Sequence, residues 1–372
     1  MASAMERDVA RRTSQTSAQA LVSVVIPTYN RAHIVRRAID SALGQSHSNV
    51  EVILVDDGST DRTRALIEET YRDESRLRYF QQKNAGVSAA RNRGLAEVRG
   101  EFVGLLDSDD AWLPWKIALQ LECLRRVPGA GMVWSDMVAV DERAKVISER
   151  YLRQMYRAYR WFKDGALFSN SETFDFAEGP GFAAGPAEVH LFWGDIFSQM
   201  IMGNLVHTST VLLRRERLDR VGGFNEDLKF SGEDYDFHLR TCREGPVAFV
   251  DVATILYTVG AADQLTQSPY GVHMAANALT VVRRTIDSDR SRIHLPHAML
   301  RSRLAAVHAW VGQELAAAGR RREARTLFWQ SARYQPWRPR SALLAVAMTL
   351  PDGVYNRLRQ LRARLRPRPA SD

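Results

Sequence analysis

The stretch VRGEFVGLLDSDDAW, residues 98–112, is the most informative part of this chain. Its apolar run, 102–106, ends abruptly in Asp107, Asp109 and Asp110, which is typical of a buried strand that delivers polar side chains to a sheet edge. In extended geometry Asp107 and Asp109 point to one face, where they repel each other unless a cation lies between them. Oxygen ligands favour Mg²⁺ or Mn²⁺. The alternative is a turn whose Asp and Ser side chains cap the following segment.

Three earlier segments repeat the order of strand, polar loop and helix. The run 21–26 ends in PTYNR and precedes a predicted helix at 32–43, and the run 50–55 ends in DDGSTD before a helix at 62–71. A short strand at 77–80 leads into KNAGVSAARNRGLAEV, a Gly-bearing loop followed by an Ala-rich helix. Alternating strands and helices predict a doubly wound, mostly parallel α/β sheet flanked by helices, whose loops converge on one crevice.

The loops of this crevice carry residues suited to a nucleotide. Neither a G-x-G-x-x-G fingerprint after the first strand nor a GxxxxGK[ST] loop occurs, so no standard dinucleotide or P-loop site is indicated. Tyr29 offers a flat face for a base, Asp57 can accept from an imide or a ribose hydroxyl, and Arg91 can neutralise phosphate. Each residue also has a plain structural interpretation, as a loop aromatic, a turn residue and a helix-surface charge.

Four motifs follow one another within residues 22–240: VSVVIPTYNR, VEVILVDDGSTDRT, NAGVSAARNRGLAEVRGEFVGLLDSDDAWLP and VGGFNEDLKFSGEDYDFHLR. Together and in this order they resemble the family 2 glycosyltransferases of the GT-A fold. The resemblance implies a nucleoside diphosphate sugar as donor and a divalent cation, Mn²⁺ or Mg²⁺, as cofactor. It implies donor contacts from Pro27, Tyr29 (stacked on the base), Asp57, Arg91 and Asp107 (facing ribose or metal), with Asp109 as the direct metal ligand.

The same resemblance assigns an acidic pair to catalysis. In inverting members the corresponding carboxylates act on the acceptor hydroxyl, which puts Asp234 first and Glu233 second as catalytic candidates. Both residues open a predicted helix, where the helix dipole favours carboxylates whatever their role. Capping is therefore the structural alternative.

The chain divides into four predicted parts. Residues 1–20 form a disordered leader, 21–130 the nucleotide-sugar-binding half, 131–260 the acceptor-binding half, and 261–372 a helical extension with a basic tail. Within the second half, a strand at 131–140 continues the sheet and 249–257 closes it as an edge strand. Between them, 146–204 is a variable insertion rich in aromatic residues and Gly, whose rings serve either sugar or lipid contacts or ordinary packing. We expect His207 to be a hydrogen-bonded strand-end residue rather than a metal ligand.

Charge is concentrated at the C-terminal end. From Arg290 onward there are 17 Arg and 4 acidic residues, a net charge of +13, whereas the whole chain carries +8, so the first 289 residues carry −5. The segment 355–369, YNRLRQLRARLRPRP, is either a solvated tail or a peripheral contact with an anionic membrane. No nucleic-acid recognition motif accompanies these arginines.

No apolar stretch approaches the length of a membrane span, and Cys123 and Cys242 suggest buried free thiols. We therefore expect a cytoplasmic protein, with the inner membrane face as an option. The helix, Gly turn and helix within 308–336 indicate one helical hairpin.

The sequence thus predicts an inverting, metal-dependent glycosyltransferase. It would move a single sugar to an acceptor hydroxyl of a cell-envelope polysaccharide or lipid-linked glycan; the chain lacks the QxxRW motif of processive members. A sugar nucleotidyltransferase, a glycoside hydrolase and a non-catalytic nucleotide-sugar-binding module are the alternatives. The filled carboxylate positions disfavour the non-catalytic module.

Overall fold

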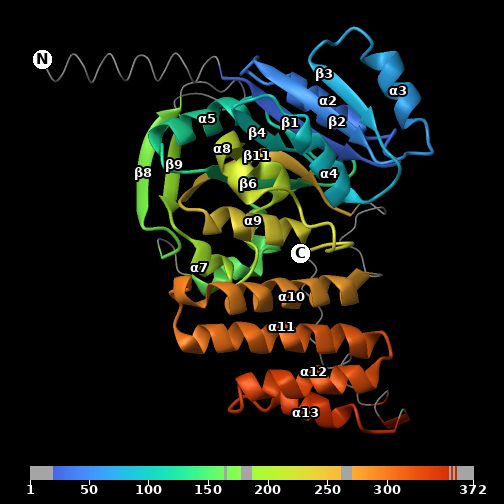
Figure 1. Ribbon diagram of the computed structural model, residues 1–372, viewed down its shortest axis with the longest axis vertical. Helices are drawn as coiled ribbons and strands as arrows, with labels where there is room; N and C mark the ends of the chain where they lie inside the picture. The colour runs from blue at the N-terminus through green and yellow to red at the C-terminus, as the bar shows by residue number, and fades with distance from the viewer. Residues whose placement is uncertain are drawn as a thin grey trace, which may run out of the picture. The chain divides into compact units, whose positions relative to one another are not determined.

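The computed structural model describes residues 20–162, 166–176, 187–260 and 270–351, together with 353, 354 and 357 (Figure 1). It contains two compact units, residues 1–265 and 266–372, which are described separately. Most of the predicted leader, the Gly/Pro cluster at 178–186 and nearly all of the segment 355–369 lie outside the described residues.

The first unit is built on one mixed sheet. Its strands, in chain order, are β1 (Val22–Thr28), β2 (Val50–Asp56), β3 (Leu77–Gln81), β4 (Phe102–Leu105), β5 (Ala111–Trp112), β6 (Met132–Val140), β7 (Val146–Ser148), β8 (Asn170–Phe176), β9 (Ala187–Gly194), β10 (Leu212–Arg214) and β11 (Val247–Thr258). They are arranged in space as β3-β2-β1-β4-β10-β6-β11-β9-β8, with β5 paired to β11 and β7 paired to β6.

The first four strands confirm the predicted parallel arrangement. β1 pairs in parallel with β2 on one side and β4 on the other, and β2 pairs in parallel with β3. All residues of β1, β2 and β4 are buried, which explains their nearly continuous apolar runs. The intervening helices are α2 (Val35–Leu43), α3 (Thr63–Thr70) and α4 (Val87–Ala96), with α5 (Lys116–Arg126) after β5. Consequently the loops after β1, β2 and β4 all leave the same edge of the sheet.

The second half of the sheet is joined to the first by one short antiparallel strand. β10 lies between β4 and β6 and pairs in antiparallel fashion with both. It follows the 3-10 turn η2 (Thr208–Thr210) and leads into α8 (Arg215–Val221), while α9 (Glu233–Arg243) precedes β11. The two predicted halves therefore share a single sheet.

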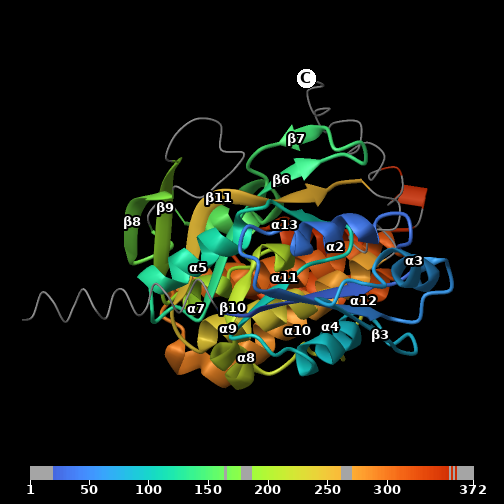
Figure 2. The same ribbon diagram turned by 90° about the horizontal axis from the view of Figure 1, so that it is seen from above.

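The prediction that 249–257 forms an edge strand was wrong. β11 pairs in parallel with β6 and in antiparallel fashion with β9 and β5, so it is an interior strand. The hairpin β8–β9, supplied by the insertion, extends the sheet beyond it, and Figure 2 shows this hairpin and β3 at opposite ends of the sheet. The insertion also contains β7, α6 (Leu152–Met155), η1 (Arg157–Trp161) and α7 (Phe197–Met200), so it is not a simple loop.

Aromatic residues of the insertion pack against the sheet. Phe168 stacks on Phe249 of β11 with ring centroids 6.2 Å apart, and it also contacts Trp134 of β6 at 5.7 Å. Tyr159 and Phe192 contact the ring of Phe249 as well. Of the two interpretations that the sequence left open for these aromatic residues, ordinary packing holds for this cluster.

The second unit consists of α10 (Gly271–Asp289), the 3-10 turn η4 (Arg290–Arg292), α11 (His297–Ala317), α12 (Arg321–Tyr334) and α13 (Arg340–Ala347). Gly319, with φ of +78°, provides the left-handed residue between α11 and α12 and confirms the predicted hairpin. Val311, Leu315 and Phe328 form the centre of its apolar core. None of the described helices is long and apolar enough to cross a membrane. In the first unit, Cys123 and Cys242 are buried and free, as predicted.

Gly104 in β4 leaves room for an aromatic ring. A Cβ at this position would lie 2.5 Å from the end of the Trp112 ring, whose indole Nε1 is held by a 2.7 Å hydrogen bond to the Ser209 carbonyl. We expect Gly104→Ala to lower the free energy of unfolding by about 1–3 kcal/mol, because the ring cannot move away without losing that bond. Chemical denaturation measures the change. Gly129→Ala, where a Cβ meets nothing within 4 Å, is the matched control and should be close to neutral.

Candidate functional site

The three carboxylates after β4 lie in a turn and not in an extended segment. β4 ends at Leu105, and the Asp110 amide donates a hydrogen bond to the Asp107 carbonyl at 3.1 Å. The expected alternation of Asp107 and Asp109 on one face of a strand is therefore wrong. The turn instead brings Asp107 and Asp110 together.

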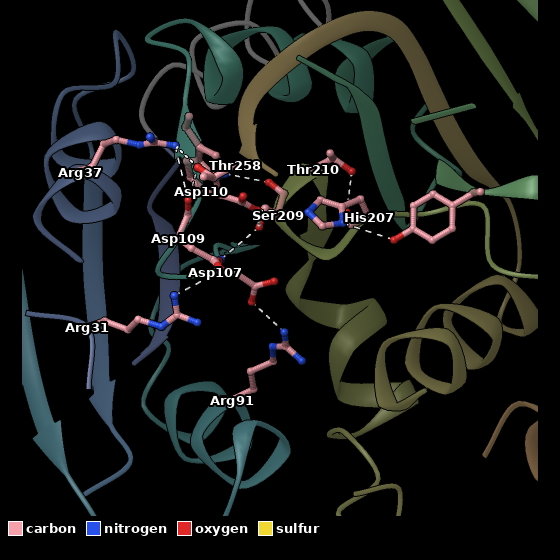
Figure 3. Close-up of polar contacts among 12 residues, drawn as sticks. Arg31, Arg37, Arg91, Asp107, Asp109, Asp110, His207, Ser209, Thr210 and Thr258 are labelled. Carbon is pink, nitrogen blue, oxygen red and sulfur yellow. Dashed lines mark hydrogen bonds and ion pairs between the residues drawn. The ribbon is translucent and has the colours of Figure 1, made fainter. Parts of the chain in front are cut away.

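Asp107, Asp110 and His207 form a compact group of potential ligands. One ligand atom from each lies within 4.8 Å of the others (Figure 3). His207 Nε2 is 3.1 Å from Asp110 Oδ2, and the Ser209 hydroxyl donates to the same oxygen at 2.5 Å. Asp110 Oδ1 is buried and has no hydrogen-bond partner among the described residues. A buried carboxylate oxygen without a partner beside a second carboxylate and an imidazole fits a divalent cation.

Asp109, which the family resemblance implies as the direct metal ligand, lies next to this group, but its carboxylate points to Arg31. Its carboxylate is 3.7 Å from Arg31 Nη1, and its backbone carbonyl accepts a 2.9 Å hydrogen bond from the Thr258 hydroxyl. Burial, with repulsion from Asp110 and Asp107, raises the pKa of Asp109 to about 7. Carboxylates gathered this closely are stabilised by any positive charge that joins them.

Arg91 connects the carboxylate turn with the start of α9. It is buried, and its guanidinium donates to Asp107 at 2.7 Å and to Glu233 at 2.9 Å. Burial alone would raise the pKa of Asp107, but the positive charge of Arg91 outweighs it and holds that pKa below its ordinary value. Arg91 is thus a buried bridge between the predicted donor and catalytic residues, not a helix-surface charge.

Asp234 has a different environment from its neighbour Glu233. Glu233 is buried and paired with Arg91, whereas Asp234 is half-buried and accepts a 3.0 Å hydrogen bond from the Asn204 side chain. Burial raises the pKa of Asp234, and burial together with Asp234 raises that of Glu233. Of the two carboxylates, Asp234 is the one that is not paired with Arg91.

The predicted donor residues lie at the ends of β1 and β2. Tyr29 follows β1 and is 46% exposed, so its ring is accessible. Pro27 is buried within β1, so its ring is not exposed. Asp57 is also buried, and its carboxylate accepts hydrogen bonds from the Gln82 side chain and from the amides of Ala85 and Gly86, at 2.8–2.9 Å. Asp57 therefore positions the Gly-bearing loop, whatever it contributes to the base.

His207 is hydrogen-bonded, as expected, but it precedes the turn η2 instead of ending a strand, and it lies among the potential ligands from which the sequence excluded it. Sequence reasoning missed three further contributors to this site. Asp110 was noted only as part of the acidic run, and Ser209 and Asn204 were not singled out. The signal for Asp110 was its position at the end of a possible turn. Ser209 carried no signal, since its link to Asp107 and Asp110 spans about a hundred residues.

Known proteins resemble this chain in sequence over the same region. Residues 23–178 match the family model described as glycosyl transferase family 2. An uncharacterized glycosyltransferase of Rickettsia typhi is 29% identical over 236 residues, 63% of this chain and 63% of that protein. Chondroitin synthase of Escherichia coli is 36% identical over 136 residues, which cover 37% of this chain and 20% of the synthase. The chain thus spans less than two thirds of the length of these relatives.

Solved structures share the fold. Residues 1–349 of S. aureus TarS, in complex with UDP-GlcNAc, superpose with a TM-score of 0.57 at 18% identity, covering 92% of this chain and 87% of that one. The mannosyltransferase PcManGT of Pyrobaculum calidifontis, in complex with GDP-Man and Mn²⁺, gives a TM-score of 0.50 at 19% identity, with 92% and 84% coverage. Residues 23–178 therefore match glycosyl transferase family 2 in sequence, and the first unit has the GT-A type of fold that these structures share.

The geometry predicts which carboxylates bind a cation. Changing groups that only orient metal ligands costs about 10–100-fold in affinity, so loss of a ligand should cost at least as much. We expect Asp110→Asn and His207→Ala to weaken Mn²⁺ binding by at least about tenfold in calorimetry, whereas Asp109→Asn should have a smaller effect. Ser209→Ala, which removes the hydrogen-bond donor to Asp110 and the acceptor of the Asp107 amide but no ligand atom, is the control for indirect damage. A larger loss in Asp109→Asn than in Asp110→Asn would show that Asp109 is the principal ligand.

Proposed function

We propose that this protein is an inverting glycosyltransferase that moves one sugar from a nucleoside diphosphate sugar to an acceptor hydroxyl. One observation carries the proposal: a continuous set of contacts joins the loop after β1 to the start of α9. Arg31 lies by Asp109, the turn containing Asp109 also holds Asp107, and Arg91 links Asp107 to Glu233. Residues for a base, a diphosphate and a reacting hydroxyl therefore lie close together at one edge of the sheet.

The donor is held by its nucleotide and its diphosphate. Tyr29 stacks on the base, and the loops held by Asp57 approach it. Arg91 is already paired with two carboxylates, so its main role is to hold Asp107 and Glu233 in place. Its charge is not available for the phosphate groups alone. The carboxylate and imidazole group of Asp107, Asp110 and His207, with Asp109 beside it, would hold the cation. When bound, a divalent cation supplies positive charge that stabilises the departing diphosphate.

Transfer takes place in a single displacement. The acceptor oxygen bonds to the anomeric carbon while the bond from that carbon to the diphosphate oxygen breaks, and its electron pair leaves with the nucleoside diphosphate. The acceptor proton passes to the Asp234 carboxylate. One base is sufficient for this reaction, which inverts the anomeric centre without a covalent enzyme intermediate. Asn204 orients Asp234 through its hydrogen bond to Oδ2.

We propose as acceptor a cell-envelope polysaccharide or a lipid-linked glycan. The family and the arginine-rich C-terminal end support this assignment, because clustered arginines suit anionic glycans and membrane surfaces. The same reasoning supports a cytoplasmic location, with peripheral contact at the inner membrane face. A sugar nucleotidyltransferase would instead release pyrophosphate, and a non-catalytic module would bind donor without turnover. Product analysis separates the three.

Calorimetry against UDP, GDP and dTDP, with and without Mn²⁺, tests both the donor-binding site and its preference for a nucleobase. We expect one nucleotide to bind in a Mn²⁺-dependent manner, and Tyr29→Ala to weaken it by about 1–3 kcal/mol, the range for base stacking on an aromatic ring. Tyr29→Phe keeps the ring and should bind like the wild type. Equal binding by Tyr29→Ala would remove the stacking role from this residue.

The catalytic role of Asp234 is tested by Asp234→Asn. The amide cannot take the proton, so kcat should fall by about 10²–10⁴-fold while donor affinity is retained. Sugar transfer to a hydroxyl acceptor and donor calorimetry measure the two quantities. Asp227→Asn, the same change at an exposed position before α9, is the matched control. Transfer at the wild-type rate in Asp234→Asn would overturn the assignment, and a loss of folding would indicate the capping role.

A further inference from the structure

The second unit contains a cavity between helices whose lining is rich in charged and polar side chains. The cavity has a volume of about 560 Å³ and is lined by residues of α10, η4, α11 and α12. These helices lie side by side in Figure 1. The volume is in the range of small-molecule sites and exceeds what a single ion needs.

The lining of this cavity is strongly basic. Arg283, Arg290, Arg301 and Arg333 line it together with His297 and His308. The described stretch 270–351 contains four acidic residues, and none of them lines the cavity. Four guanidinium groups around one space repel each other, and a bound anion relieves that repulsion.

The four arginines divide into two held by the protein and two available. Arg301 donates from Nε to the Tyr334 carbonyl at 2.9 Å and from Nη2 to the Arg333 carbonyl at 3.2 Å, at the C-terminal end of α12. Arg290 donates to the Ile293 carbonyl at 3.1 Å. Arg283 and Arg333 make no side-chain hydrogen bond or ion pair within the described part of the chain. Their guanidinium N–H groups are therefore available to a ligand. A planar guanidinium can donate two parallel hydrogen bonds to the oxygens of one phosphate.

His308 and Tyr334 add polar rings to the lining. His308 Nδ1 lies 2.7 Å from the Leu304 carbonyl, so Nδ1 carries the proton, because a carbonyl only accepts. Burial lowers the pKa of His308, so the neutral imidazole keeps Nε2 as an acceptor. The rings of His308 and Tyr334 are 5.3 Å apart. They add a hydroxyl and a ring nitrogen for a polar organic ligand.

Apart from Gln330, the rest of the lining is apolar. Ile286, Leu300 and Leu304 contribute aliphatic side chains, and Leu300 is buried. A free inorganic ion would leave this surface unused. An organic molecule that carries phosphate would contact both kinds of lining.

We propose that the cavity among α10, α11 and α12 binds a phosphate ester, with the phosphate between Arg283 and Arg333 and the organic part against Ile286, Leu300 and Leu304. This site is separate from the sugar transfer proposed above and does not depend on it. The ester is either a soluble compound or the headgroup of an acidic phospholipid, which share the same phosphate chemistry.

The test uses the full chain without added Mn²⁺ or nucleotide. Glycerol 3-phosphate is titrated by calorimetry, and vesicles of phosphatidylcholine with and without phosphatidic acid are tested by flotation. Hydrogen exchange locates the response. We expect a probe to bind and to protect peptides spanning 283–304 and 330–334. The double variant Arg283→Gln/Arg333→Gln should weaken binding by at least about tenfold, since each charge-assisted hydrogen bond contributes about that factor.

Arg325→Gln, an exposed arginine of α12 that does not line the cavity, is the matched control and should bind like the wild type. Binding of glycerol 3-phosphate identifies a soluble ester as the ligand class. Binding only to vesicles with phosphatidic acid, lost in the double variant and kept in Arg325→Gln, identifies a lipid headgroup. No binding of either probe, or equal binding by the double variant and the wild type, would overturn the proposal.

Discussion

The candidate site depends on the two ion pairs that the buried Arg91 guanidinium makes. Arg91 pairs with Asp107 from the turn after β4 and with Glu233 from the start of α9. Its guanidinium also lies 5.0 Å from the centre of the Phe224 ring, which stacks on Phe237 of α9 at 4.3 Å. Removing one partner of a buried ion pair costs about 3–5 kcal/mol, because the remaining charges are left uncompensated. One side chain therefore fixes both the geometry of the candidate active site and the packing of α9.

Much of the fold could be predicted from local patterns. β1, β2 and β4 are buried on both faces, so their sequences are nearly continuous apolar runs, and each run ends where polar residues enter the crevice. Gly319 marked the turn between α11 and α12 in the same way. These features depend on residues that are close in the sequence.

The remainder depends on contacts between distant segments. The apolar run of β11 suits an edge strand or an interior strand equally well, and only the β8–β9 hairpin decides between them. The spacing of Asp107 and Asp109 suggested one face of a strand, whereas the chain turns after Leu105 and brings Asp110 beside Asp107 and His207. His207 comes from the far side of the insertion, so no local pattern could pair it with the carboxylates. Even the family resemblance, which supplied most of the site, did not indicate these partners.

The position of β10 also constrains the order in which the sheet can form while the chain is being synthesised. Asp107 receives its Ser209 contact from a segment 102 residues further along the chain, and β4 gains its second neighbour only when β10 arrives. Until then, one side of β4 is an unpaired edge next to an acidic turn. The halves 21–130 and 131–260 are thus separate in the sequence but not in the structure, because they share one sheet. The candidate site also needs Glu233 and Asp234, which follow β10 in the chain, so it is completed late in synthesis and an N-terminal fragment that ends before β10 lacks both carboxylates.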